Sequence, residues 1–199
     1  MERVAVAGLS LHQAGVNELE RLKQGLAALE QPAAKTLADH LGASEAVLLS
    51  TCNRCELVFA RENGHAPARA DRLALARALG LEDTDELAER LFLHTGRGAA
   101  RHLFRVTASL DSLVLGEDQI LAQVRAAFAE ARELGLTGRL LGALFEQALL
   151  LGKRVRTRTE LAHHPVSVVS PGVACLLERL DGLPAARTCA RIWSAPSTS

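Results

Sequence analysis

Residues 46–60 read AVLLSTCNRCELVFA and carry the clearest signal for strand structure in the chain. Residues 46–50 and 56–60 are short apolar runs with the length and composition of β-strands. Between them lies the polar segment Thr51-Cys52-Asn53-Arg54. The pattern therefore predicts two strands with a cysteine and an arginine at the point where they end.

Helical patterns account for most of the remaining chain, because apolar residues recur three and four positions apart. Further short strands are expected at residues 4–7 and 91–94, and a loop at residues 61–67. The helices expected from periodicity, proline and glycine cover residues 15–30, 32–41, 68–79, 97–106, 117–135, 140–151 and 170–180. Strands in front and helices behind predict the α+β class, with a small mixed or antiparallel sheet packed with helices.

Composition limits the classes of protein to which the chain can belong. Its 199 residues have zero net charge and 48% hydrophobic residues, which suits one soluble packed domain and disfavours a protein that coats nucleic acids. A basic run at residues 153–158 is a local candidate for phosphate contacts, although its place at a helix end also explains it. Four cysteines are too few for a secreted disulfide scaffold. No apolar run approaches the roughly 20 residues of a membrane span, so we expect no membrane contact and a cytoplasmic location.

Cys52 is a candidate nucleophile, because an arginine two residues away can favour the thiolate. The structural alternative is a small buried side chain, which is the commoner state of a lone cysteine. Cys52 and Cys55 also form a C-x-x-C pair, which suggests a redox dithiol or half of a zinc site. A structural zinc site takes four ligands, and His163 and His164 are adjacent instead of helically spaced, so we expect no metal.

A second polar cluster lies in residues 111–124, DSLVLGEDQILAQV. Glu117 and Asp118 fall at a helix start, where the helix dipole alone would favour acidic residues. Gln119 and Gln123 are four residues apart on one helical face and present two amides to a polar ligand such as an amino acid. His102, on a helix upstream, decides nothing by itself, since a lone histidine is more often structural.

Four segments together resemble glutamyl-tRNA reductase in their order and spacing. They are Ser50-Thr51-Cys52-Asn53-Arg54-x-Glu56, His102-Leu103-x-Arg105-Val106, the run Asp111-Ser112-Leu113-Val114-Leu115-Gly116-Glu117-x-Gln119-Ile120-Leu121-x-Gln123-Val124, and Gly152-Lys153-x-Val155-Arg156-Thr157. The resemblance covers roughly residues 1–183. It implies a catalytic domain at residues 1–160 that leads into a long connecting helix, of which residues 161–183 would be the start.

The resemblance also implies a reaction and a set of site residues. In that family a cysteine takes glutamate from glutamyl-tRNA as a thioester, and NADPH reduces the thioester to glutamate-1-semialdehyde for tetrapyrrole (porphyrin) synthesis. Cys52 corresponds to that cysteine, and His102 to a position important for activity. The implied substrate contacts are Thr51, Cys52, Asn53, Arg54, Ser112, Glu117, Asp118, Gln119 and Gln123. Arg54 would pair with the glutamate carboxylate, since a guanidinium binds a carboxylate through two parallel hydrogen bonds.

The chain departs from the family pattern after residue 183. Residues 184–199 form an irregular tail without the G-x-G-x-x-G turn of a dinucleotide-binding domain. We therefore expect a truncated member that lacks the NADPH-binding and dimerisation domains. Such a chain would be a monomer, would form the thioester on Cys52, and would not reduce it. The alternatives are a non-catalytic fragment that binds glutamyl-tRNA and a small thiol redox module built on Cys52 and Cys55.

Overall fold

The computed structural model describes residues 2–11, 13–30, 32–61, 67–79, 84–111 and 118–158. Strands and helices alternate through the first half of the chain, and helices follow in the second half. In chain order the elements are β1 (Val4–Ser10), α1 (Val16–Ala28), α2 (Ala33–Leu41), β2 (Glu45–Ser50), β3 (Arg54–Ala60), α3 (Arg69–Ala78), α4 (Thr84–Arg90), β4 (Phe92–Thr95), α5 (Arg97–Thr107), α6 (Asp118–Glu133) and α7 (Arg139–Arg158).

The strands form one four-stranded sheet in the order β2-β3-β1-β4, and every neighbouring pair is antiparallel. In the register, Val6 of β1 lies opposite Val58 of β3 on one side and His94 of β4 on the other. The predicted α+β class and the antiparallel sheet are therefore confirmed. The two strands expected on either side of Thr51–Arg54 form the β2–β3 hairpin at the edge of the sheet.

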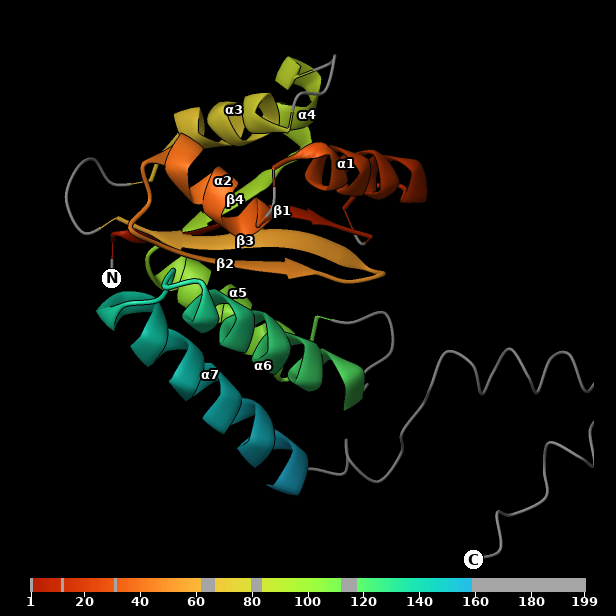
Figure 1. Ribbon diagram of the computed structural model, residues 1–199. Helices are drawn as coiled ribbons and strands as arrows, with labels where there is room; N and C mark the ends of the chain where they lie inside the picture. Colours follow the sequence, from red (N-terminus) through yellow and green to blue (C-terminus); the bar gives the residue numbers. More distant parts are fainter. Residues whose placement is uncertain are drawn as a thin grey trace, which may run out of the picture.

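Helices cover both faces of this sheet, as Figure 1 shows, with α1 to α4 on one side and α5 to α7 on the other. The two central strands, β1 and β3, are consequently buried along their whole length. A strand covered on both faces has no solvent side, so its sequence lacks the polar alternation of a half-exposed strand. This explains why VAVAGLS and CELVFA read as nearly continuous apolar runs.

Most of the expected helices and strands are present, with small shifts at their ends. Gly42 ends α2 in the left-handed conformation, with a φ of 59°, as its place after residue 41 predicts. Helix α7 is longer than expected, because it continues past residue 151 to Arg158. Helix α4 was missed, since LEDTDELAER has many acidic residues and little apolar periodicity. The helices expected at 161–183 and 170–180, and the tail 184–199, lie outside the described residues.

A buried carboxylate joins the edge strand to the start of α7. Glu45, the first residue of β2, is 7% exposed and accepts hydrogen bonds from the backbone N–H groups of Gly138 (2.8 Å), Leu140 (3.0 Å) and Leu141 (2.7 Å). The first N–H groups of a helix have no partner within the helix and carry partial positive charge, so a carboxylate satisfies both needs. This contact sets where α7 begins against the sheet.

Farther along, α7 crosses the end of α5 closely. A Cβ on Gly152 would lie 2.8 Å from the carbonyl oxygen of Thr107 and 3.0 Å from Cδ1 of Leu121. Only glycine leaves room for this approach. The basic run 153–158 therefore begins immediately after the contact between α7 and the end of α5.

A close backbone approach at Gly8 predicts that alanine substitutions at two glycines will change stability very differently. Gly8 in β1 faces Glu56 in β3, and a Cβ at Gly8 would meet the Cys55 carbonyl oxygen and lie 2.7 Å from Cα of Glu56. Because backbone atoms cannot move aside cheaply, Gly8→Ala should lower the free energy of unfolding by about 3 kcal/mol or more. Urea denaturation measures this change.

The matched control is Gly142→Ala in α7, where a Cβ would meet nothing within 4 Å. Alanine is favoured over glycine inside a helix, so this variant should gain about 0.5–1 kcal/mol. Equal stability of the two variants would mean that β1 and β3 are farther apart than described.

Candidate functional site

The β2–β3 hairpin turns at Cys52 and Asn53. The Thr51 N–H donates to the Arg54 carbonyl oxygen (2.8 Å), and the Asn53 N–H donates to Oγ1 of Thr51 (3.2 Å). A third hydrogen bond, from the Leu11 N–H to the Asn53 carbonyl oxygen (2.9 Å), ties the turn to the end of β1. The turn is thus held on both sides, while the Cys52 side chain is exposed to solvent.

A lysine from α1 also contacts this turn. The Nζ of Lys23 donates to the carbonyl oxygen of Cys52 at 3.3 Å and lies 3.7 Å from Oε1 of Glu20. Its side chain is 24% exposed, so the ammonium is neither free in solvent nor fully buried. Sequence reasoning missed Lys23, because it is 29 residues from Cys52 and no local pattern connects them.

Arg54 is at the centre of a buried network. Its guanidinium, 2% exposed, donates from one terminal nitrogen to Oε1 of Glu56 (2.8 Å) and to Oδ2 of Asp111 (3.3 Å), and from the other to the Asp111 backbone carbonyl. Arg54 and Glu56 are two residues apart on β3, so they project from the same face of the sheet. Asp111 follows α5, 57 residues away in sequence.

Glu56 extends the network to α5. Its second carboxylate oxygen accepts a hydrogen bond from Nε2 of His102 (3.0 Å), and Glu56 is 2% exposed. The His102 ring also lies against two rings of β4, 5.1 Å from His94 and 5.0 Å from Phe92 between centroids. With Nε2 engaged by Glu56, Nδ1 is the ring nitrogen that remains for another partner.

His94 differs from an ordinary surface histidine. Burial, followed by the charge of His102, lowers the pKa of His94, and Arg101 acts in the same direction. Glu56 and Asp111 act against this shift but do not reverse it. At neutral pH the His94 ring is therefore held uncharged beside His102.

Arg54 therefore has a different position from the one that sequence reasoning gave it. We expected its guanidinium to favour the Cys52 thiolate, but its described partners are Glu56 and Asp111. The cationic group with a described hydrogen bond to Cys52 is Lys23, through the backbone carbonyl. A two-point grip on a carboxylate by Arg54 requires Asp111 to move, because Asp111 occupies both terminal nitrogens.

The two cysteines of the C-x-x-C pair have different environments. Cys52 is exposed, Cys55 is buried, and neither forms a disulfide. Burial, followed by the charge of Glu56, raises the pKa of Cys55 to about 12. A thiol with this pKa stays protonated and unreactive at neutral pH, so the pair lacks the second reactive thiol that a redox dithiol requires.

A polar groove lies beside the network. Its volume is about 420 Å³, and it runs along α5 from Gly98 to Asp111, which follows the helix. It is also lined by Ser10 at the end of β1 and Gln13 after it, by His94 of β4, and by Arg101, His102 and Arg105 of α5. Nearly all of these side chains are polar, so the groove suits a charged or hydrogen-bonding ligand.

The two glutamines expected to bind substrate lie in the first two turns of α6. Gln119 is exposed, and Gln123 lines a separate cavity of about 360 Å³ together with Ser50 of β2. Ser112 and Glu117 lie outside the described residues, as does the side chain of Asp118. The structure thus brings Thr51, Cys52, Asn53 and Arg54 into one turn and joins His102 to it through Glu56. It leaves Ser112, Glu117 and Asp118 as predictions.

Within the described ranges, no group of three or more His, Cys, Asp and Glu side chains is arranged to hold a metal ion. None of the described helices has the length and apolar character needed to cross a bilayer.

Comparison with known proteins gives one consistent result. A family profile described as "Glutamyl-tRNAGlu reductase, N-terminal domain" matches residues 7–159. The chain is 47% identical over 133 residues to the glutamyl-tRNA reductase of Marinobacter nauticus, covering 67% of this chain and 30% of the relative. It is 46% identical over 176 residues to that of Rubrobacter xylanophilus, covering 87% and 39%.

A solved structure has a similar fold. The glutamyl-tRNA reductase from Methanopyrus kandleri aligns with a TM-score of 0.68 and 33% identity, over 90% of this chain and 40% of that one. The chain therefore spans 30 to 40% of the length of the relatives that it matches.

The contrast between Cys52 and Cys55 predicts a simple reactivity pattern. In a chain with Cys175→Ser and Cys189→Ser, Ellman's reagent at pH 8 should modify one thiol rapidly and the other only on unfolding. The reason is that the thiolate is the reacting species, and burial keeps Cys55 protonated. Adding Cys52→Ser should remove the rapid phase, whereas adding Cys55→Ser should leave it. Two rapid phases of equal size would contradict the buried position of Cys55.

Proposed function

Because the chain belongs to the glutamyl-tRNA reductase family through its amino-terminal domain, we propose that Sγ of Cys52 attacks the ester that joins glutamate to its tRNA. A carbon–sulfur bond forms to the ester carbonyl carbon, and the carbon–oxygen bond to the terminal ribose breaks. The thiol proton leaves the sulfur, and the ribose oxygen takes up a proton. The products are a glutamyl thioester on Cys52 and uncharged tRNA.

The observation that carries this proposal is the position of Cys52. It is exposed at the tip of a hairpin whose neighbours Thr51, Asn53 and Arg54 are fixed by hydrogen bonds. A nucleophile on a rigid turn can be held close to a bound ester, and such positioning contributes much of the rate of a group-transfer reaction. Lys23 adds a second restraint, since it holds the Cys52 carbonyl group from the side of α1.

Recognition of the glutamyl group is assigned to the network behind the turn. Arg54 would bind the side-chain carboxylate of glutamate, which then replaces Asp111 on the guanidinium. Asp111 is suited to give way, because its side chain is 27% exposed whereas that of Glu56 is 2% exposed. Glu56 stays in place and keeps Arg54 and His102 oriented. Ser112, Glu117, Asp118, Gln119 and Gln123 would complete the site around the amino acid.

His102 is proposed as a positioning residue. Its described contacts are with Glu56 and with the rings of His94 and Phe92. Nδ1 is the ring nitrogen that can face a substrate, since Nε2 donates to Glu56. This arrangement resembles the orientation of a histidine by a carboxylate in other group-transfer sites.

The activity of the whole family, NADPH-dependent reduction of the thioester to glutamate-1-semialdehyde for tetrapyrrole synthesis, belongs to the same proposal. The described residues do not fit a dinucleotide. Their strands pair antiparallel, and the turn from β4 to α5, Gly96-Arg97-Gly98, has Arg101 where a third glycine would be required. No hydride-transfer step is therefore assigned to them.

Covalent capture tests the proposal directly. The purified chain is incubated with glutamyl-tRNA, quenched in acid and analysed by intact mass, and a gain of one glutamyl group is expected. Cys52→Ser should abolish the gain. Cys55→Ser should retain most of it, because Cys55 is buried and protonated. Equal loss in both variants would favour a dithiol. Binding of tRNA with no mass gain in the wild type would favour a non-catalytic fragment.

A second prediction separates the structural and substrate-binding roles of Arg54. Lysine has one ammonium group and cannot contact Glu56 and Asp111 as the planar guanidinium does. Arg54→Lys should therefore lower the unfolding free energy by about 2–3 kcal/mol and reduce the rate of capture by about 100-fold or more, equivalent to at least 2.7 kcal/mol. Denaturation and quenched-flow capture measure the two effects. Reduced stability with unchanged capture would make Arg54 a purely structural residue.

A further inference from the structure

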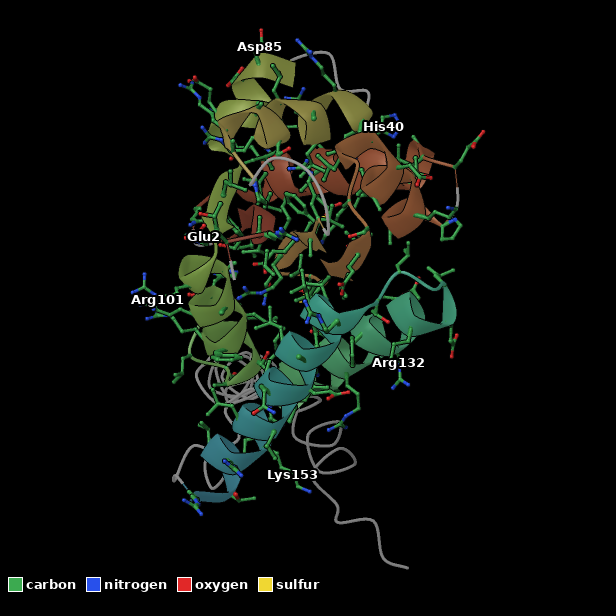
Figure 2. All side chains as sticks on the ribbon, turned by 90° about the vertical axis from the view of Figure 1, so that its left-hand side faces the viewer. Glu2, His40, Asp85, Arg101, Arg132 and Lys153 are labelled. Carbon is green, nitrogen blue, oxygen red and sulfur yellow. The ribbon has the colours of Figure 1, made fainter. Side chains whose placement is uncertain are left out.

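Helix α5 has two chemically distinct faces. Ala99, Ala100, Leu103 and Val106 are buried against the sheet and α7. The opposite face carries Arg97, Arg101 and Arg105, which are exposed and spaced four residues apart. Helical geometry places successive members of this stripe about 6 Å apart along the axis. In Figure 2, Arg101 projects outward from α5, away from the rest of the protein.

Few negatively charged side chains lie near these arginines. Within the described residues, no carboxylate lies within ion-pair distance of Arg97 or Arg101, and the carboxylate near Arg105 is Asp111 at 3.9 Å. Helix α5 itself contains no acidic residue. In a chain with zero net charge, such a stripe is a local concentration of positive charge.

Two of the three arginines line the polar groove described above. Arg101 and Arg105 border it together with His94, His102, Ser10 and Gln13. His102 and Asp111 are the members of the Arg54 network that reach this groove, and through Glu56 and Arg54 they connect it to the turn that carries Cys52. A ligand in the groove would thus lie next to a ligand of Arg54.

We propose that this groove binds phosphate groups at the acceptor end of the tRNA, with Arg101 and Arg105 as the phosphate-binding residues. The inference rests on the proposed function and extends it. Two guanidinium groups one helical turn apart suit successive phosphates of an extended strand, whereas a single carboxylate is bound bidentately by one guanidinium. Uncharged His94, Ser10 and Gln13 supply hydrogen-bonding groups for the sugar between the phosphates.

A second basic segment begins where α7 crosses the end of α5. Gly152 of α7 lies against Thr107 at the end of α5, and the next six residues, 153–158, contain four basic residues and no acidic one. Lys153, Arg154 and Arg158 are exposed. The end of α5 therefore adjoins a second concentration of positive charge.

The test uses the whole chain with uncharged tRNA for glutamate, labelled with a fluorophore, in titrations between 50 and 200 mM salt. Arg101→Ala/Arg105→Ala should weaken binding about tenfold or more. It should also flatten the plot of log affinity against log salt by about 1.4, because each single-strand phosphate contact contributes about 0.7 to the slope. Arg101→Lys/Arg105→Lys should retain most of the affinity and the slope, since lysine keeps the charge.

The matched control removes the same charge elsewhere. Arg77 of α3 and Arg139 at the start of α7 are exposed and do not line the groove. Arg77→Ala/Arg139→Ala should leave affinity and slope within twofold of the wild type. Equal effects of the two double variants, or no effect of Arg101→Ala/Arg105→Ala, would overturn the proposal. Because uncharged tRNA is the probe, binding is measured even if Cys52 forms no thioester.

A second donor of the glutamyl group distinguishes the two negatively charged ligands that the groove could bind, which are the tRNA phosphates and the glutamate carboxylate. Glutamyl-adenosine has the ester and the carboxylate but no phosphate. If the groove binds phosphate, Arg101→Ala/Arg105→Ala slows capture from glutamyl-tRNA much more than capture from glutamyl-adenosine. If capture from both donors slows equally, the groove binds the glutamate carboxylate and the phosphate proposal is wrong.

Discussion

The buried contact between Arg54 and Glu56 is the interaction on which the rest of the site depends. Both side chains are 2% exposed, so each charge has lost its water and is compensated by its neighbours. A buried ion pair contributes little net stability, yet removal of one partner is costly, because the other charge then remains buried and unpaired. The pair therefore restricts the geometry of the hairpin, α5 and Asp111 more than it stabilises the fold.

The two faces of strand β3 have different roles: one packs into the hydrophobic core, and the other carries the ionic network. Cys55 and Leu57 line an apolar region with Leu22 of α1 and Leu37 of α2. Arg54 and Glu56 reach Asp111 and His102 on the side of α5. Because alternate residues of a strand project to opposite faces, one short segment supplies both the core and the ionic network. Cys55 lies on the apolar face of β3, whereas Cys52 lies in the turn before the strand begins, so the two cysteines have different environments.

Helix α5 also has two faces with different roles, one apolar and buried and the other positively charged and exposed. Its small and apolar residues allow close packing against the sheet and α7, while its arginines remain in solvent. Zero net charge for the whole chain gives no hint of this arrangement, because the charge is separated between surfaces and not between segments. A binding surface for a polyanion can thus exist on a protein that is neutral overall.

The sequence by itself determined the class of fold, most of its elements, and the turn that carries Cys52. These follow from local rules: the periodicity of apolar residues, Gly42 as a helix stop, and a polar segment between two apolar runs. Because the structure begins β3 at Arg54, the two-residue spacing of Arg54 and Glu56 places both on one face of the sheet.

Tertiary structure alone decided which groups meet. Lys23 reaches the Cys52 carbonyl from 29 residues away, and Asp111 reaches Arg54 from 57 residues away. It also decided that Arg54 faces two carboxylates, that Cys55 is buried, and that Arg101 and Arg105 border one groove with His94. No local pattern encodes such contacts, because they arise when the hydrophobic core brings distant segments together and burial then changes their charges and pKa values.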